Sequence, residues 1–153
     1  TLPLEMNTWK LRSIGKFFGL AGIRLGFVLA NDEQINQLSL RQSPWSVSNL
    51  ARWAGKLALN DTAWQAQQTS RLQQQSQCLT TSLTDHGIKP TIQTDYFVTI
   101  VSEQHREWGE MAAQSQLLLR HLPAIHGLRL GLPAQEKEWN RLRQWLSQLK
   151  QVS

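Results

Sequence analysis

Cysteine is almost absent from the sequence, with Cys78 alone among 153 residues. A single cysteine cannot form an internal disulfide, so we expect a protein of a reducing compartment, and the cytoplasm is the expected location. Cys78 lies in a glutamine-rich run with no histidine at a telling distance, which favours an ordinary helix position over a nucleophile. The four histidines show no metal-ligand spacing, so we expect no metal site.

Long apolar runs are also missing. A membrane-spanning helix needs about 18 or more consecutive apolar residues, and no stretch of this kind occurs, so we expect no membrane partner. Residues 1–9 lack the charged start and apolar run of a signal peptide. They also lack an initiating methionine, from which we expect a processed or excised piece of a longer chain.

Acidic residues are fewer than basic ones, with 11 Asp and Glu against 16 Lys and Arg and a net charge of +5. Basic proteins can bind nucleic acid through phosphate neutralisation. Here, however, the cations are scattered and no zinc-finger pattern occurs, so we expect no nucleic-acid partner. A mildly basic surface, or an acidic part missing from this chain, explains the charge better.

Hydrophobic periodicity and turn residues predict a mixed fold, α/β with an α+β small domain. The run at 25–30 is expected to be a buried strand, and Trp139 and Trp145 are expected to pack on or beside the apolar face of the last helix. The composition changes near residue 43, where a domain boundary is expected. The expected strands are 11–16, 25–30, 94–101 and 127–132, and the expected helices are 32–42, 48–59, 62–84, 107–120 and 135–150.

The segment RSIGKFFGLAGIRLGF, residues 12–27, carries the chemistry. Its glycines allow a turn that folds back, so that Ser13, Lys16 and Arg24 converge. Two cations and a hydroxyl make a plausible phosphate site. Neighbouring cations also lower the pKa of a lysine and activate it for Schiff-base chemistry. On these residues alone, a surface turn with two solvated cations remains an equal alternative.

The spacing Ser-x-x-Lys, with Arg eight residues after the lysine, resembles the pyridoxal-phosphate (PLP) lysine signature of class I and II aminotransferases. The resemblance implies the fold of that superfamily and PLP as the cofactor. It implies Lys16 as the catalytic Schiff-base lysine, with Ser13 and Arg24 as ligands of the cofactor phosphate. One departure is Gly15, because many family members carry Ser or Thr immediately before the lysine. One phosphate hydroxyl is then absent or replaced by a backbone N–H.

The resemblance extends along the chain. The segment SPWSVS at 43–48 is similar to the loop of the histidinol-phosphate aminotransferase branch that leads into the helix joining two domains, and its Trp45 could cover substrate. The segment HGLRLGLP at 126–133 is similar to the place where the family keeps an arginine for the substrate carboxylate, which implies this role for Arg129. Pairing of Arg129 with a structural acid is the alternative. Arg120 matches another position near the substrate.

Within this branch, the amino-acid sequence is similar to that of the threonine-phosphate decarboxylases of cobalamin biosynthesis. This implies decarboxylation of O-phospho-L-threonine to aminopropanol phosphate, a small-molecule amino-acid phosphate as substrate, and a homodimer in the full-length form. Residues 1–43 are then the end of the PLP-binding large domain, and 44–153 are the inter-domain helix and small domain. The isolated piece is expected to be inactive. The alternatives are a histidinol-phosphate-type aminotransferase and a non-catalytic regulatory or interaction domain.

Overall fold

The computed structural model describes residues 8–149, and these residues form two compact units that divide between Ala66 and Gln67. The division lies inside one long helix, 23 residues after the composition change that the sequence shows near residue 43. The assignment of residues 1–43 to a large domain stays a prediction. Each unit is described here by itself.

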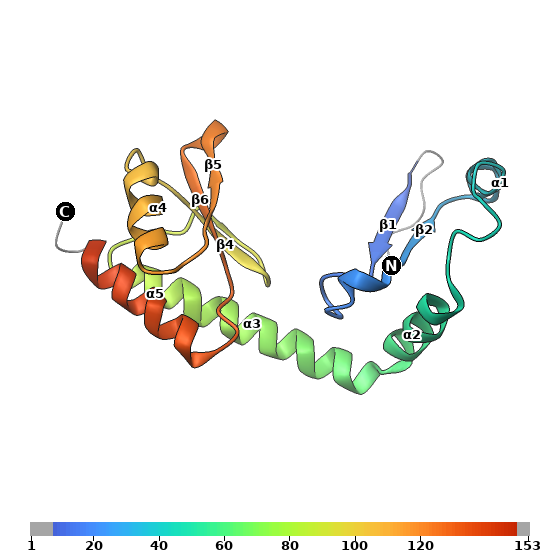
Figure 1. Cartoon of the computed structure of the whole chain (residues 1–153), viewed down its shortest axis with the longest axis horizontal. Helices are drawn as coiled ribbons and strands as arrows, with labels where there is room; N and C mark the ends of the chain where they lie inside the picture. The colour runs from blue at the N-terminus through green and yellow to red at the C-terminus, as the bar shows by residue number, and fades with distance from the viewer. Residues whose placement is uncertain (1–7, 150–153) are drawn as a thin grey trace. The chain divides into compact units, whose positions relative to one another are not determined.

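The first unit is built on an antiparallel hairpin (Figure 1). Its two helices begin at capping residues, because the side chains of Asn31 and Ser48 accept hydrogen bonds from the backbone N–H groups of Gln34 and Ala51. Its elements are β1 (Lys10–Ser13), the 3₁₀ helix η1 (Ala21–Ile23), β2 (Gly26–Leu29), α1 (Asp32–Ser39) and α2 (Asn49–Asn60).

The expected buried strand at 25–30 is a strand, but its burial was wrongly predicted. Among residues 8–149, β2 pairs only with β1, and Leu11 of β1 is 76% exposed while Leu29 of β2 is 46% exposed. An apolar strand becomes buried only when further strands or helices cover its faces. The described residues of this unit supply no third strand, so the hairpin presents apolar side chains to solvent.

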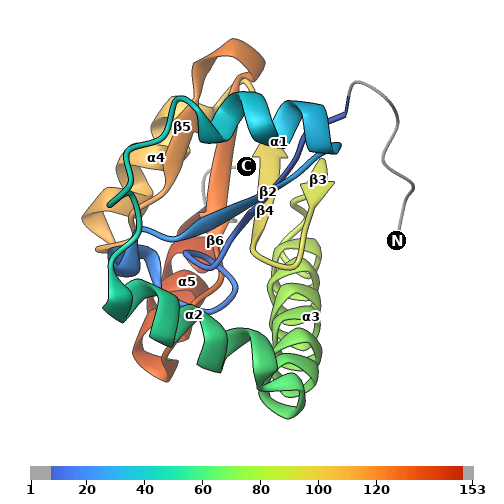
Figure 2. The ribbon, with the colours of Figure 1, turned by 90° about the vertical axis from the view of Figure 1, so that its right-hand side faces the viewer.

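The second unit is a four-stranded antiparallel sheet in the order β3-β4-β6-β5, with helices packed on it. Figure 2 shows β4 and β6 side by side, as their five-residue register requires. The helix expected at 62–84 has these bounds in the structure. The elements that belong wholly or partly to this unit are α3 (Thr62–Thr84), β3 (Ile92–Gln93), β4 (Phe97–Val101), α4 (His105–Gln114), β5 (Arg120–Leu122), η2 (Pro123–Ile125), β6 (Gly127–Gly131) and α5 (Glu136–Leu149).

The core of the second unit lies between one face of the sheet and helices α3, α4 and α5. Trp145 is fully buried, as the sequence predicts, and its indole N–H donates to the carbonyl of Trp108 at 3.0 Å. Trp139 is half-buried against the same core. The members of the core are Leu79, Leu83, Ile88, Val98, Ile100, Ala112, Leu128, Leu130, Leu142, Trp145, Leu146 and Leu149.

The helix expected at 107–120 was predicted too long. α4 ends at Gln114, and Gln116 adopts a left-handed conformation with φ of 58°. The N–H of Leu117 then donates to the carbonyl of Ala112 at 2.8 Å, which closes the helix end as a Schellman-type cap does. Arg120 therefore begins strand β5, and the sheet has two short strands, β3 and β5, that the sequence analysis missed.

Candidate active site

The loop between β1 and β2 carries the predicted lysine. Pairing of Ser13 with Gly26 closes the hairpin, so both ends of the loop are held together. Within the loop, the N–H of Leu20 donates to the carbonyl of Ile14 at 3.3 Å, and the N–H of Gly19 donates to the carbonyl of Lys16 at 3.1 Å. Gly19 adopts φ of 68°, a conformation that glycine reaches without steric cost.

Helix α2 supports this loop from one side. Ile14 is buried, and a Cβ atom at Gly55 would overlap the side chain of Leu25 and touch that of Ile14. Because Gly55 has no side chain, the helix backbone approaches the loop closely. The two residues that flank the turn, Ile14 before Lys16 and Leu25 after Arg24, are thus packed against α2.

An aromatic cluster lies immediately after the lysine. The rings of Phe17 and Phe18 meet edge to face at 4.9 Å, and Phe18 stacks on Trp64 at 5.6 Å between ring centroids. Aromatic pairs with this spacing stabilise a structure beyond the apolar area they bury. The backbone around Lys16 is therefore held by Ile14 before it and by the two phenylalanines after it.

Ser13, Lys16 and Arg24 line one pocket of about 460 Å³. The Lys16 side chain is exposed and makes no hydrogen bond or ion pair with any described residue. The Arg24 guanidinium donates from Nη1 to the carbonyl of Ala21 at 3.2 Å, and its other N–H groups have no partner among residues 8–149, so they are available to a ligand. Two cations and a hydroxyl on one pocket wall have the donor chemistry that a phosphate group requires.

Gly15, which departs from the family pattern, sits in a tight position. Its N–H donates to Ser13 Oγ at 3.0 Å. A Cβ at this position would lie 3.2 Å from Ser13 Oγ and 3.4 Å from the Cα of Ala21. The Gly15 amide is thus engaged by Ser13, whose own hydroxyl proton stays available to an anion.

Arg129 and Arg120 lie in the second unit, directly opposite each other on β6 and β5. Directly paired residues of antiparallel strands share one face of the sheet, so both side chains emerge on the same side. Neither arginine forms an ion pair within residues 8–149. Arg129 is half-buried, and its guanidinium carbon lies 4.9 Å from the centroid of the Phe97 ring.

Phe97 is a contact of Arg129 that the sequence analysis missed. Only the strand register reveals it, because 32 positions separate the two residues and no local pattern links them.

Trp45 lies in the loop between α1 and α2, is 91% exposed, and is not among the residues that line the Lys16 pocket.

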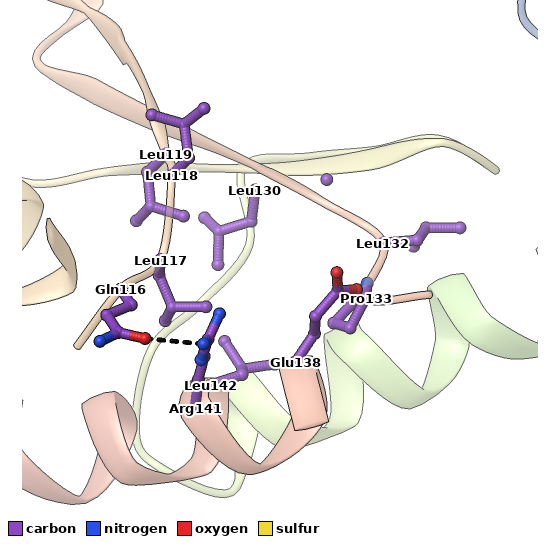
Figure 3. A pocket seen from close by; sticks show the side chains of 11 residues that line it. Gln116, Leu117, Leu118, Leu119, Leu130, Leu132, Pro133, Glu138, Arg141 and Leu142 are labelled. Atoms are coloured by element: carbon purple, nitrogen blue, oxygen red, sulfur yellow. Dashed lines mark hydrogen bonds between the residues drawn. The ribbon is translucent and has the colours of Figure 1, made fainter. Parts of the chain in front are cut away.

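A second pocket, of about 280 Å³, lies in the second unit between the 116–119 segment, the end of β6 and helix α5 (Figure 3). Leucine side chains dominate its wall. Its cation, Arg141, donates to Gln116 Oε1 at 2.6 Å, so this guanidinium already has a partner. The pocket contains none of the residues that the sequence analysis selected.

Comparison with known proteins decides the family. The model of the family described as aminotransferase class I and II matches residues 4–143. This chain belongs to the class I and II aminotransferases. The chain is 38% identical over 132 residues to threonine-phosphate decarboxylase of Pseudomonas aeruginosa, with coverage of 86% of this chain and 40% of that protein.

Two solved structures share the fold of this chain. The first is L-threonine-O-3-phosphate decarboxylase from Porphyromonas gingivalis, with a TM-score of 0.77, 18% identity, and coverage of 96% of this chain and 48% of that one. The second is histidinol-phosphate aminotransferase from Sinorhizobium meliloti in complex with PLP, with a TM-score of 0.79, 17% identity, and coverage of 96% and 42%. The chain thus spans less than half the length of these relatives.

Membership in this family and the PLP found in the Sinorhizobium meliloti protein support PLP as the cofactor. Across residues 8–149, no cluster of three or more His, Cys, Asp or Glu is arranged to hold a metal ion. Over the same range, no helix combines the length and the apolar character that crossing a bilayer takes.

Proposed function

We propose that this chain is part of a PLP-dependent enzyme that decarboxylates O-phospho-L-threonine to aminopropanol phosphate, a step of cobalamin biosynthesis. The observation that carries the cofactor part is the shared pocket of Ser13, Lys16 and Arg24. The identity of 38% to a threonine-phosphate decarboxylase supports the substrate and reaction. PLP supplies an electron sink for the pair released when a bond to Cα of an amino acid breaks.

Each residue of the Lys16 pocket has a separate role in this proposal. The Lys16 amine would be the covalent attachment point of PLP. When it is not bonded to the cofactor, the same amine would carry a proton. Arg24 binds the cofactor phosphate through its free N–H groups, because a guanidinium matches two phosphate oxygens at once. The Ser13 hydroxyl donates a further hydrogen bond to the same phosphate while it accepts from Gly15.

The arginine pair of the second unit supports a substrate with two anionic groups. Like charges placed directly opposite on neighbouring strands destabilise a sheet, and no acidic partner offsets them among the described residues. A bound ligand with two anionic groups offsets this repulsion. We assign Arg129 to the carboxylate of the substrate and Arg120 to its phosphate, which are the two anions of O-phospho-L-threonine. Trp45 is assigned to cover the substrate.

A histidinol-phosphate-type aminotransferase is the second candidate, because the PLP-bound relative from Sinorhizobium meliloti has this activity and shares the fold. The two reactions use the same lysine and differ in which bond to Cα breaks. A decarboxylase releases carbon dioxide from O-phospho-L-threonine, whereas an aminotransferase converts its amino donor to an oxo acid. Homodimer formation and a cytoplasmic location stay predictions, as does a non-catalytic regulatory role.

The decisive experiment is an absorbance scan with added PLP, followed by borohydride trapping and peptide mapping. It compares this chain with a longer form that includes whatever precedes it in the natural protein. We expect a visible band in the longer form and label on Lys16. Lys16→Ala should abolish the label, whereas Lys56→Ala, at an exposed position of α2, should leave it unchanged.

Label on another lysine, or no band in either form, would overturn the PLP assignment and favour a plain interaction domain. With the cofactor established, release of carbon dioxide from carboxyl-labelled O-phospho-L-threonine tests the reaction. Formation of an oxo acid without carbon dioxide would contradict decarboxylation and favour the aminotransferase.

A further inference from the structure

We propose that Phe97 is a positioning residue that holds the guanidinium of Arg129 ready for the substrate carboxylate. This inference rests on the proposed function of Arg129. It adds a residue that determines how firmly the guanidinium is held in position for the carboxylate. The observation behind it is the 4.9 Å separation between the Arg129 guanidinium carbon and the centroid of the Phe97 ring.

The strand register explains how the two side chains meet. Phe97 pairs with Gly131 on β6, and Arg129 pairs with Thr99 on β4. Phe97 and Arg129 are therefore diagonal neighbours on one face of the sheet, a spacing that aromatic and long side chains span. The direct partner of Phe97 is a glycine, so no side chain at position 131 competes with Arg129 for the ring.

The contact fixes the arginine without occupying its hydrogen-bond donors. A cation over an aromatic face is held by the ring quadrupole, and this attraction needs no N–H group. Arg129 has no ion pair within residues 8–149 that would compete with a ligand. Its planar fork of N–H donors therefore stays available for two carboxylate oxygens.

The neighbouring arginine shows what the ring changes. Arg120 lies directly opposite Arg129 and is also without an acidic partner among the described residues, but it is exposed and makes no cation–π contact within that range. Arg129 is half-buried and supported by Phe97. Of the two cations, Arg129 is thus the one with a fixed position, as a residue that orients a carboxylate needs.

The first test is a nuclear magnetic resonance measurement on the 153-residue chain, which needs neither cofactor nor activity. In the wild type, the ring current of Phe97 should shift the side-chain Nε–H resonance of Arg129, because the guanidinium carbon lies 4.9 Å from the ring centroid. Phe97→Leu should remove this shift and raise the mobility of the Arg129 side chain. Phe97→Tyr should keep the shift and the low side-chain mobility of the wild type. Val101→Ala, on the same face at the far end of β4, is the matched control and should leave the resonance unchanged.

The second test uses the PLP-loaded natural protein. Phe97→Leu should raise KM for O-phospho-L-threonine about 3- to 10-fold, the loss expected for one cation–π contact of a half-buried arginine, between the exposed and the fully desolvated cases. Phe97→Tyr should restore the wild-type KM. For the product amine, which lacks the carboxylate, the inhibition constant should be the same in wild type and Phe97→Leu.

The outcomes separate this inference from the function on which it rests. If Arg129→Ala weakens substrate binding while Phe97→Leu changes neither KM nor the Arg129 resonance, Phe97 has no positioning role and the function stands. If Phe97→Leu weakens the binding of the substrate and of the product amine equally, the effect of the substitution is structural and the inference is wrong. If Arg129→Ala leaves substrate binding unchanged, the carboxylate assignment fails, and the positioning role fails with it.

Discussion

Gly55 of α2 lies so close to Leu25 that any side chain at position 55 would overlap the leucine. Leu25 directly follows Arg24, a proposed ligand of the cofactor phosphate, and Gly55 belongs to a helix that carries none of the proposed catalytic residues. This contact is therefore the means by which α2 determines where the loop of Lys16 and Arg24 lies.

Substitution of Gly55 tests that relationship. Gly55→Ala should destabilise the protein by up to about 2 kcal/mol, because overpacking costs about 1–3 kcal/mol and alanine returns about 1 kcal/mol of helix stability. Urea unfolding and a PLP titration measure the two effects, and PLP affinity should fall as Arg24 shifts. Gly22→Ala is the control, since nothing lies within 4 Å of a Cβ at that position. Equal stability and PLP affinity of the two variants would contradict the supporting role of α2.

Removal of the Arg24 charge tests the phosphate assignment. Arg24 adopts φ of 56°, a left-handed conformation that an unbranched side chain tolerates better than a β-branched one, so Arg24→Gln is the suitable change. Loss of a hydrogen bond to a charged group costs about 1.5–3 kcal/mol, so the PLP dissociation constant should rise by about 10- to 100-fold. A fluorescence titration measures it. Arg41→Gln, at an exposed position, should change PLP affinity little, and the same loss in both variants would indicate a general charge effect.

Trp145 is expected to be the most sensitive aromatic position of the second unit. Trp145→Phe removes the hydrogen bond from the indole N–H to the carbonyl of Trp108 and removes buried apolar area. A hydrogen bond contributes about 0.5–1.5 kcal/mol net, and the lost packing adds to this. Chemical denaturation monitored by circular dichroism should show a fall in unfolding free energy of at least that size. Trp53→Phe, at a residue 62% exposed in α2, should change it by less than about 0.5 kcal/mol.

Ser76 should link α3 to the sheet. Its buried hydroxyl donates to the carbonyl of Thr94 at 2.8 Å and accepts from Gln93 at 3.3 Å. Ser76→Ala leaves that carbonyl without its hydroxyl donor, so stability should fall by about 1–3 kcal/mol. Amide hydrogen exchange at β3 and β4 should become faster. Ser70→Ala, six residues earlier on the exposed side of α3, should change neither the stability nor the rate of amide hydrogen exchange. Equal amide protection in Ser76→Ala and Ser70→Ala would show that the link is unimportant.

Several elements could be predicted because their signals are local. A helix begins where a side chain caps N–H groups three residues ahead, and Asn31 and Ser48 do this at the expected places. The convergence of Ser13, Lys16 and Arg24 was also predictable, because twelve residues with three glycines between two strands must fold back on themselves. The spacing of these residues is what indicated the family.

Strand pairing and burial were decided by the tertiary structure. The strand at Arg120 and the contact of Phe97 with Arg129 depend on residues that are distant in sequence, and the exposure of β2 follows from the lack of a third strand among the described residues of its unit. By itself the sequence determined the family and the long helix α3 and indicated Lys16 as the proposed cofactor lysine, because caps, turns and motif spacing act over a few residues. Only the packing of the sheet placed Arg129 on an aromatic ring, because register is set by the buried faces of strands that the chain brings together from afar.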